Sequence, residues 1–304
     1  MATPLVSVII PTYNRAHVLG RAIHSVLAQT YEGLELIVVD DASTDNTQGL
    51  VERIKDSRVR YLRHDHNKGG GAARNTGIAA AQGEYIAFQD SDDEWLVEKL
   101  ERQVSLLQTT GSAVAGVYCG YIRRAGDRVS YLPGPQCRDR KVSLVTKLLC
   151  LYCPIGTQTL LLKRKPLIEV GCFDERLRRR QDGELLLRLS LTYELEVVDE
   201  PLVVMNILTE RVTNDVAALI KAEEIILAKH QEYFNKHPGV LASRFYGLGR
   251  EKCHNGVLAL GRRDFINAIK VSPLHWRAWG ALLLSMFGTN GFIAAARLHR
   301  RLRT

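Results

Sequence analysis

The sequence predicts an α/β fold in which helices flank a mostly parallel, Rossmann-like sheet, followed by a helical C-terminal extension. Strand-like and helix-like periods alternate through the first hundred residues, which is the pattern of βαβ units. From about residue 213 the apolar residues follow a helical period. At 304 residues, 46% apolar and 24% charged, the chain can bury one large core or two modest ones.

Four short segments in the first hundred residues predict strands, and the first of them is a continuous β-branched run. These four segments cover residues 5–11, 34–41, 59–64 and 84–90. The segments with helical spacing cover residues 15–30, 47–55, 70–81 and 94–108. Sheets built from such units bind ligands at the carboxyl ends of their strands.

The rest of the chain divides at about residue 210. Before that point the pattern predicts a hairpin-like excursion at 113–133, a strand at 156–165, a helix at 181–193 and a strand at 193–206. After it the pattern predicts a helix at 217–234 and a helical hairpin at 240–273 that turns at residues 261–264. We therefore expect a first domain over 1–210 and a helical, basic extension over 211–304.

Three of the predicted strands end in clusters of polar residues. These clusters are residues 12–15, Asp40 with Asp41, and residues 90–93. Turn chemistry can account for any single cluster, because Asp, Asn and Ser are common in turns. Three clusters at successive carboxyl ends would open onto one edge of the sheet, and this indicates a shared ligand site.

The third cluster places four carboxylates in five positions: Asp90, Asp92, Asp93 and Glu94. Like charges this close raise one another's pKa. The pair Asp90-x-Asp92 can offer oxygen ligands to a hard divalent cation such as Mg²⁺ or Mn²⁺. These ions take one or two protein carboxylates and complete their shell with phosphates and water. A bound cation would also offset the repulsion within the cluster.

Four ordered blocks of the chain resemble the inverting nucleotide-sugar glycosyltransferases of family 2, which have the GT-A fold. The blocks are VSVIIPTYNR, LIVVDDASTDNT, NKGGGAARNTGIAAAQGEYIAFQDSDDEW and FDERLRRRQDGELLLRL. The resemblance runs from about Val6 to Val198 and implies a nucleotide-binding half at about 1–110 and an acceptor half at about 111–210. It further implies transfer of a sugar from a nucleotide sugar, expected to be a UDP-sugar, to a hydroxyl of a glycan or lipid-linked glycan.

The resemblance also implies roles for individual residues. The residues expected to line the pocket for the base are Pro11, Thr12, Tyr13 and Asp41. Asp41 would accept a hydrogen bond from the ring, and Arg74 would approach the nucleotide. Asp90 would meet the ribose or a metal-bound water, and Asp92 would bind the metal, Mg²⁺ or Mn²⁺. For Arg74 the alternative is a surface cation at the start of a helix.

Asp182 is the catalytic base that the resemblance implies. An inverting transfer needs one carboxylate to take the proton of the attacking hydroxyl, and in the family this Asp precedes an apolar helix. The family often has Glu before this Asp and an aromatic residue after it, whereas this chain has Gln181 and Gly183. Glu184 is the reserve candidate, and a plain helix N-cap is the alternative for Asp182.

Two other classes of protein share some of these features. A sugar-nucleotide pyrophosphorylase also has a βαβ start and a metal-binding Asp, but it needs a Gly-rich loop with Arg directly after the first strand. This chain has PTYNR there. A non-catalytic nucleotide-sugar-binding or assembly protein would not need Asp41, Asp90, Asp92 and Asp182 together. A glycosyltransferase therefore fits the sequence better than either alternative.

The charge of the chain is concentrated in its second part. Residues 1–200 carry 26 Lys and Arg and 26 Asp and Glu, whereas residues 201–304 carry 15 and 7, which accounts for the net charge of +8. The end of the chain, 276–304, combines an apolar run too short to span a bilayer with several Arg residues. It could lie on an anionic membrane or be a packed helix with a basic tip. No nucleic-acid-binding motif is present.

The N-terminus and the cysteines predict a cytoplasmic protein that is at most peripheral to a membrane. The first eleven residues have no basic segment, and their apolar run is too short for a signal sequence. The six cysteines form no disulfide framework, and Cys150 with Cys153 is a lone CxxC pair. Reduced thiols are expected.

Overall fold

The structure, a computed structural model, describes residues 5–126, 128–132, 155–207 and 215–293. These residues fall into two compact units, which lie within residues 5–207 and 215–293. The pair Cys150 and Cys153 lies outside the described residues. Cys119, Cys172 and Cys253 are free thiols.

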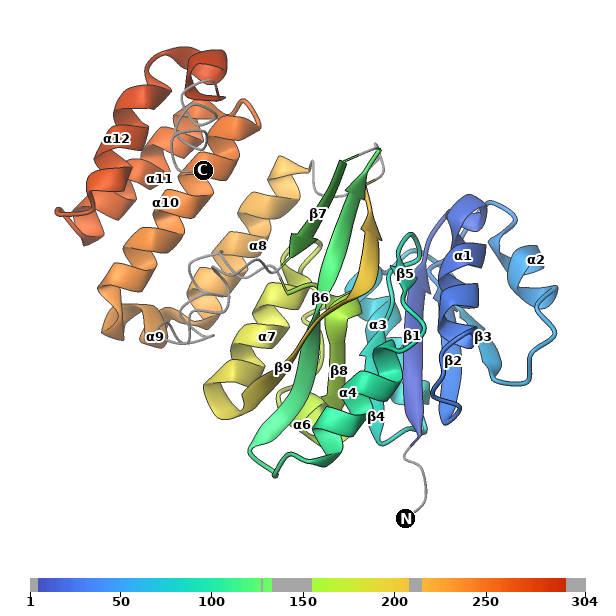
Figure 1. Ribbon diagram of the computed structural model, residues 1–304. Helices are drawn as coiled ribbons and strands as arrows, with labels where there is room; N and C mark the ends of the chain where they lie inside the picture. The colour runs from blue at the N-terminus through green and yellow to red at the C-terminus, as the bar shows by residue number, and fades with distance from the viewer. Residues whose placement is uncertain (1–4, 127, 133–154, 208–214, 294–304) are drawn as a thin grey trace. The chain divides into compact units, whose positions relative to one another are not determined.

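The first unit is built on one sheet of nine strands, counted over the described residues (Figure 1). The order is β3-β2-β1-β4-β8-β6-β9-β5, with β7 beside β6. The strands are β1 (Val6–Thr12), β2 (Leu34–Asp40), β3 (Val59–Arg63), β4 (Tyr85–Phe88), β5 (Glu94–Trp95), β6 (Val114–Ala125), β7 (Arg128–Leu132), β8 (Leu160–Lys163) and β9 (Glu194–Asn206).

Strands β3, β2, β1 and β4 are parallel, as the sequence predicts. The order reverses at β1, which has β2 on one side and β4 on the other, and β4 then pairs antiparallel with β8. Ligands of open α/β sheets bind at such a switch point, outside the carboxyl ends of the strands. This places the ends of β1 and β4 at the expected binding edge.

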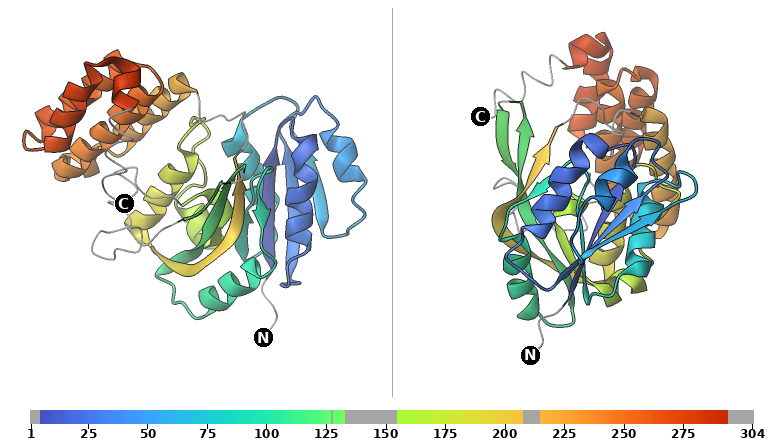
Figure 2. Two further views of the ribbon diagram at one scale, coloured as in Figure 1. Left: turned by 45° about the horizontal axis from the view of Figure 1, so that its top comes forward. Right: turned by 90° about the vertical axis from the view of Figure 1, so that its right-hand side faces the viewer.

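Helices cover both faces of this sheet (Figure 2). They are α1 (Ala16–Leu27), α2 (Thr47–Glu52), α3 (Gly70–Ala80), α4 (Lys99–Gln108), α6 (Arg164–Glu169) and α7 (Gln181–Thr192). One face forms a core in which Val8 and Ile10 of β1 pack with Leu19 of α1 and Leu100 of α4. On the other face α3 approaches closely, because a Cβ on Gly77 would lie 2.4 Å from a side-chain carbon of Ile9.

The predicted helix over 94–108 is wrong at its start. Glu94 and Trp95 form β5, which pairs antiparallel with β9, and α4 begins only at Lys99. The indole of Trp95 is buried and donates to the carbonyl of Gln158 (3.1 Å). Burial of this large ring therefore overrides the helical preference of the segment. In the predicted strand 156–165, residues Thr157–Thr159 form a 3₁₀ turn before β8.

The second unit is helical throughout its described residues. Its helices are α8 (Val216–Lys229), α9 (Gln231–Lys236), α10 (Pro238–His254), α11 (Leu258–Val271) and α12 (Trp276–Ser285). Buried ion pairs join Glu223 to Arg244 and Lys252 to Asp264, each at 2.6 Å. None of the helices in the described ranges has the length and apolar character needed to cross a bilayer.

Two predictions for this unit are corrected. The expected helix 217–234 breaks at His230 into α8 and α9. The hairpin of α10 and α11 turns at Gly256, which has φ +82°, and not at residues 261–264. Gly261 instead lies inside α11, where an added Cβ would meet the sulfur of Cys253 at 2.4 Å. The glycine there serves close helix packing, because a side chain would separate the two helices.

Candidate active site

Asn14 ties together the loops that follow β1 and β2. Its side-chain oxygen accepts from the backbone N–H groups of Thr44 (2.7 Å) and Asp45 (3.3 Å). The backbone N–H of Asn14 donates to the hydroxyl of Ser43 (2.9 Å). Asn14 and Ala42 both have left-handed backbone, with φ of 53° and 66°. Such conformations are uncommon for residues other than glycine and cluster at functional sites. The first two polar clusters are therefore one connected element.

The side chain of Asp41 is buried and accepts three hydrogen bonds from the chain. The donors are Nδ1 of His64 (2.7 Å) and the backbone N–H groups of Lys68 (2.8 Å) and Gly69 (2.7 Å). His64 reaches on through Nε2 to the hydroxyl of Thr76 (2.9 Å). Asp41 thus fixes the turn from which α3 begins, a role that the sequence did not reveal.

This environment limits what else Asp41 can do. A carboxylate offers about four acceptor positions, and three of those on Asp41 are taken. Among the described residues Oδ2 accepts from Gly69 alone, so one position on it remains for a further donor. The contact of Asp41 with the nucleotide base stays a prediction, and any such contact comes in addition to its structural role.

Arg74 on α3 joins two parts of the site that are far apart in the sequence. Its guanidinium donates to Asp90 after β4 (2.8 Å) and to Gln181 at the start of α7 (3.0 Å). The guanidinium also lies 5.5 Å from the centre of the Phe173 ring, which packs edge-on against Phe88. The side chain is only 13% exposed, so Arg74 is not the loose surface cation of the alternative interpretation.

The four carboxylates of the acidic cluster have different environments. Asp90 pairs with Arg74, and Glu94 accepts from the side-chain amide of Asn206 (3.1 Å). Asp93 is buried and accepts from the backbone N–H of Asn206 (2.9 Å) and from Nε2 of Gln158 (3.0 Å). Asp92 is half-buried. The repulsion expected from the sequence is thus reduced by separate partners for most of the cluster.

The repulsion nevertheless acts on Asp93. Burial, together with the charges of Asp90 and Asp92, raises the pKa of Asp93 to about 8. Because both neighbours act on the same group, the three carboxylates lie close together around this turn. No role for Asp93 could be inferred from the sequence, because the order of residues does not indicate which carboxylate of the cluster becomes buried.

The acidic turn fits a divalent cation that brings its own further ligands. In the described part of the chain, no three His, Cys, Asp or Glu side chains form a group able to hold a metal. Carboxylates of Asp90 and Asp92 are hard oxygen donors on one turn, and Mg²⁺ or Mn²⁺ commonly takes only one or two of these together with substrate phosphates. The donor set present therefore suits a metal bound jointly with a diphosphate.

Asp182 lies in the first turn of α7 and is half-buried. It is not the N-cap, because that position belongs to Arg180, which has left-handed backbone with φ 65°. The carboxylate of Asp182 accepts from the N–H of Gly183 (2.8 Å). An acidic side chain suits this position, because the first turn of a helix carries partial positive charge.

Glu184 does not suit the role of reserve base. Its side chain is fully buried and is bound by Arg188, whose Nε and Nη2 donate to it at 2.9 and 2.8 Å. Arg188 also donates to the carbonyls of Val170 and Cys172. The ion pair therefore anchors the segment before α7, and a hydroxyl substrate could not reach Glu184.

The predicted residues at the end of β1 are also at the expected edge. Pro11 and Thr12 end the strand, and Tyr13 follows it with 45% of its surface exposed. The hydroxyl of Thr12 is buried, and nothing in the described residues hydrogen-bonds to it. A ligand or a water is needed to satisfy such a group.

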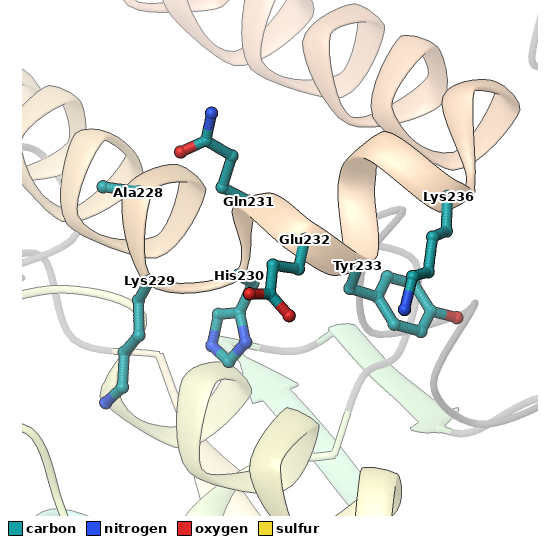
Figure 3. Close-up of a pocket in the computed structure, with 7 residues that line it drawn as sticks. All are labelled: Ala228, Lys229, His230, Gln231, Glu232, Tyr233 and Lys236. Atoms are coloured by element: carbon teal, nitrogen blue, oxygen red, sulfur yellow. The ribbon is translucent and has the colours of Figure 1, made fainter.

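A separate hollow of about 510 Å³ lies at the junction of α8 and α9 (Figure 3). Its lining is His230 and Tyr233 with the surface side chains of Lys229, Glu232 and Lys236, besides Ala228 and Gln231. It contains none of the residues predicted for the site. Its lining is open and mixed in charge, so it does not compete with the sheet edge as the reaction centre.

A family model described as Glycosyl transferase family 2 matches residues 7–182, which is more than half of the chain. An uncharacterized glycosyltransferase of Rickettsia prowazekii is 34% identical over 224 residues, which cover 73% of this chain and 69% of that protein.

A second relative is the Escherichia coli protein named UDP-Glc:alpha-D-GlcNAc-diphosphoundecaprenol beta-1,3-glucosyltransferase WfgD. It is 48% identical over 103 residues, which cover 34% of this chain and 41% of the relative. The match thus spans about two fifths of the length of that protein.

Solved structures show the fold. S. aureus TarS in complex with UDP-GlcNAc superposes with a TM-score of 0.60 at 18% identity, covering 88% of this chain and 90% of that one. The mannosyltransferase PcManGT from Pyrobaculum calidifontis, in complex with GDP-Man and Mn²⁺, gives 0.60 at 20% identity, covering 97% and 87%. The predicted α/β fold of GT-A type with C-terminal helices is confirmed.

Proposed function

Because this chain belongs to glycosyl transferase family 2, we propose that it is a metal-dependent, inverting enzyme acting on a lipid-linked glycan. It is a glycosyltransferase, and the proposal concerns its donor, acceptor and mechanism. A UDP-sugar donor and a diphosphate-lipid acceptor are suggested by the name of the E. coli relative, which matches over 41% of its length. The observation that carries the proposal is the bridge of Arg74 between Asp90 and Gln181, which ties the acidic turn to the helix that bears Asp182.

The donor would bind at the carboxyl ends of β1, β2 and β4. Pro11, Thr12 and Tyr13 would line the pocket of the base, where the buried Thr12 hydroxyl lacks a partner in the described residues. Asp41 would accept from the base through its remaining position on Oδ2. Arg74 and Asp90 would lie beside the ribose and the diphosphate, and their ion pair would keep both groups in place before the donor arrives.

Asp92 would hold the metal, with the donor's diphosphate as a further ligand. When bound, Mg²⁺ or Mn²⁺ would act as a Lewis acid that stabilises the departing nucleoside diphosphate. Support comes from the oxygen donors of the acidic turn and from Mn²⁺ in the complex of PcManGT, which shares the fold. Asp93 would stabilise the turn through its hydrogen bonds with Asn206 and Gln158.

Asp182 would act as the general base. It would take the proton of the attacking acceptor hydroxyl while that oxygen forms its bond to the anomeric carbon and the bond to the diphosphate breaks. One displacement of this kind inverts the anomeric configuration. An added Cβ on Gly183 would meet nothing within 4 Å, so the space beside Asp182 is open for an acceptor.

A diphosphate-lipid acceptor implies work at a membrane surface. We place the enzyme at the cytoplasmic face, as a peripheral protein, because the described cysteines are free thiols and suit a reducing compartment. The basic segment 276–304 is the part of the chain expected to meet the membrane.

The test is release of nucleoside diphosphate from a panel of nucleotide sugars, with and without a GlcNAc-diphosphate-lipid acceptor. We expect release from a UDP-sugar that depends on Mg²⁺ or Mn²⁺ and increases with the acceptor. Release from GDP- or dTDP-sugars only, or full activity in excess chelator, would refute the donor or the metal assignment respectively.

A further inference from the structure

The exposed side of α12 carries the large apolar residues of this helix, and its packed side carries small ones. The buried positions in α12 are Ala278, Ala281 and Ser285. The exposed positions are Trp276 (66%), Trp279 (54%), Leu283 (60%) and Leu284 (37%), followed by Met286 (66%) and Phe287 (71%). A surface helix of a globular protein has the opposite arrangement, with its apolar stripe turned to the core.

These side chains form one continuous stripe, which we call the α12 face. Trp276, Trp279 and Leu283 recur at spacings of three and four residues, so they lie on the same side of the helix. Phe287 extends the stripe beyond the end of the helix, and Leu274, 92% exposed, extends it before the start. Contiguous apolar surface of this kind marks an interaction site.

The α12 face takes no part in the hydrophobic cluster that α12 shares with its neighbours. The buried members of this cluster are Cys253, Phe265, Ala281 and Phe292. Within this unit α12 lies along one side of the bundle, against α11 and α10 (Figure 1). The exposed aromatic residues therefore serve something other than the packing of these helices.

The part of the chain that contains α12 carries charges of one sign. After Asp264 the chain contains six Lys and Arg residues and no Asp or Glu. Two of the cations, Lys270 and Arg277, are exposed in the described part, and the guanidinium of Arg277 lies 5.3 Å from the centre of the Trp276 ring. An apolar stripe with two Trp residues and a basic surround is the pattern of helices that lie in the interface of an anionic bilayer.

We propose that the α12 face docks on the surface of an anionic lipid bilayer, with its Trp residues at the level of the headgroups. Trp suits this depth because its ring is apolar and its N–H is polar. A second copy of the chain is a poorer occupant, since a self-contact through this face would bring like charges together. The proposal adds a residue-level docking surface to the proposed function and does not depend on which sugar is transferred.

Intrinsic fluorescence tests the proposal on the unmodified full-length chain. The protein has three Trp residues, and the third, Trp95, is 3% exposed. A change in emission on adding vesicles therefore reports Trp276 and Trp279. With phosphatidylglycerol vesicles we expect a blue shift and quenching by lipids brominated near the headgroup, and with pure phosphatidylcholine a smaller effect. Emission that does not change with either vesicle would overturn the proposal.

Sedimentation with the same vesicles separates the apolar face from simple charge attraction. The double variant Trp276→Ala, Trp279→Ala should bind anionic vesicles at least about tenfold more weakly, because it removes the largest apolar groups of the face. The matched control is Ile168→Ala with Leu191→Ala, which removes apolar side chains of 51% and 46% exposure from the first unit. The control should bind as the wild type does.

Two results would defeat the proposal. Equal vesicle binding by the Trp double variant and the wild type would leave only non-specific charge attraction. A wild-type dimer that the Trp double variant dissociates in sedimentation velocity would assign the face to a second copy. Nucleotide release by the Trp double variant on a water-soluble acceptor checks that it is folded, so a failure here is distinct from a failure of the proposed reaction.

Discussion

Arg74 of α3 and Asp90, which follows β4, form an ion pair of 2.8 Å, and the same guanidinium donates to Gln181, the residue before Asp182. One side chain thus sets the position of the acidic turn relative to the start of α7. Arg suits this task because its planar fork can donate to two acceptors at once, whereas Lys presents a single charged point.

We expect Arg74→Lys to lower kcat/KM by about tenfold or more, because a hydrogen bond to a charged group contributes about 1.5–3 kcal/mol. The measurement is steady-state nucleotide release, with thermal unfolding as the check on folding. The control is Arg21→Lys, whose pair with Glu94 is long at 3.8 Å and whose side chain is 50% exposed. Equal kinetics for the two variants would remove Arg74 from the site.

Asp182→Asn should lower the transfer rate by about 10²–10⁴-fold, since it keeps the shape of the base but cannot accept the proton. Donor affinity, measured by calorimetry, should stay close to that of the wild type. The wild-type product should have the anomeric configuration opposite to the donor's, which NMR can determine. Retention of configuration would be incompatible with a single displacement.

The comparison variant is Glu184→Gln. It breaks a buried ion pair with Arg188, and such losses cost about 3–5 kcal/mol. Its melting temperature should therefore fall clearly, while that of Asp182→Asn should not. The reverse result, a stable but inactive Glu184→Gln, would return Glu184 to the list of candidate bases.

Asp92→Ala should abolish metal-dependent transfer, by at least about a hundredfold, because the metal supplies several kcal/mol of charge stabilisation in the transition state. Without metal its free energy of unfolding should be unchanged or higher, since a like charge beside Asp90 and Asp93 is removed. Glu98→Ala, which removes an exposed carboxylate paired with Arg102, is the control. Wild-type activity of Asp92→Ala at saturating Mn²⁺ would place the metal elsewhere.

Asp41→Asn should destabilise the fold as well as weaken donor binding. The amide N–H groups of Asn would face N–H groups that now donate to the carboxylate of Asp41. A buried polar group left without a partner in this way costs about 1–3 kcal/mol. Chemical denaturation measures the first effect and calorimetry with UDP the second. Thr76→Val, which removes only the outer contact with His64, should cost less. Unchanged stability would contradict the structural role assigned to Asp41.

Lys99 makes stability depend on pH. It is fully buried, its Nζ donates to Gln103 (2.8 Å) and lies 3.7 Å from the centre of the Trp95 ring, and burial lowers its pKa from 10.5 to about 8. Below pH 8 the amine is charged in both the folded and the unfolded protein, so the cost of burying the charge is fully present. Between pH 8 and 10.5 only the unfolded chain keeps the proton, so the contribution of Lys99 to stability improves as pH rises.

The variant Lys99→Met isolates this effect. Its advantage in unfolding free energy over the wild type should be on the order of 3 kcal/mol at pH 7, less the cost of leaving the Gln103 oxygen unpaired. That advantage should shrink as the pH is raised to 10. Urea denaturation at both pH values measures it, and a difference independent of pH would show that the pKa of Lys99 is not lowered in the folded protein.

The parallel half of the fold could be predicted because its information is local. Each of β1 to β4 is a short apolar run, and each polar cluster directly follows its strand, so the binding edge could be inferred from spacing. Arg74 could be predicted as a site residue from the resemblance to the family. Its contact with Gln181 could not, because the two residues are 107 positions apart. No periodicity encodes such a pair.

The errors have the same origin. Trp95 leaves the predicted helix because its indole finds a partner in Gln158, and Glu184 is lost as a base because Arg188 covers it. His64 could have been found, since it directly follows β3 at the same edge of the sheet. Asn206 could not, because its importance comes only from the carboxylates that it contacts.

The bonds from Asn206 to the acidic turn span 112 to 114 positions of the chain. During synthesis the first 110 residues, with all the strands expected to bind the nucleotide, leave the ribosome long before their last partner does. Contacts so distant in sequence form late, because the closure of a long loop precedes them. We therefore expect a nascent chain that ends before β9 to form the parallel half of the sheet without fixing the conformation of the acidic turn. The enzyme would then become active only after β9 has been synthesised.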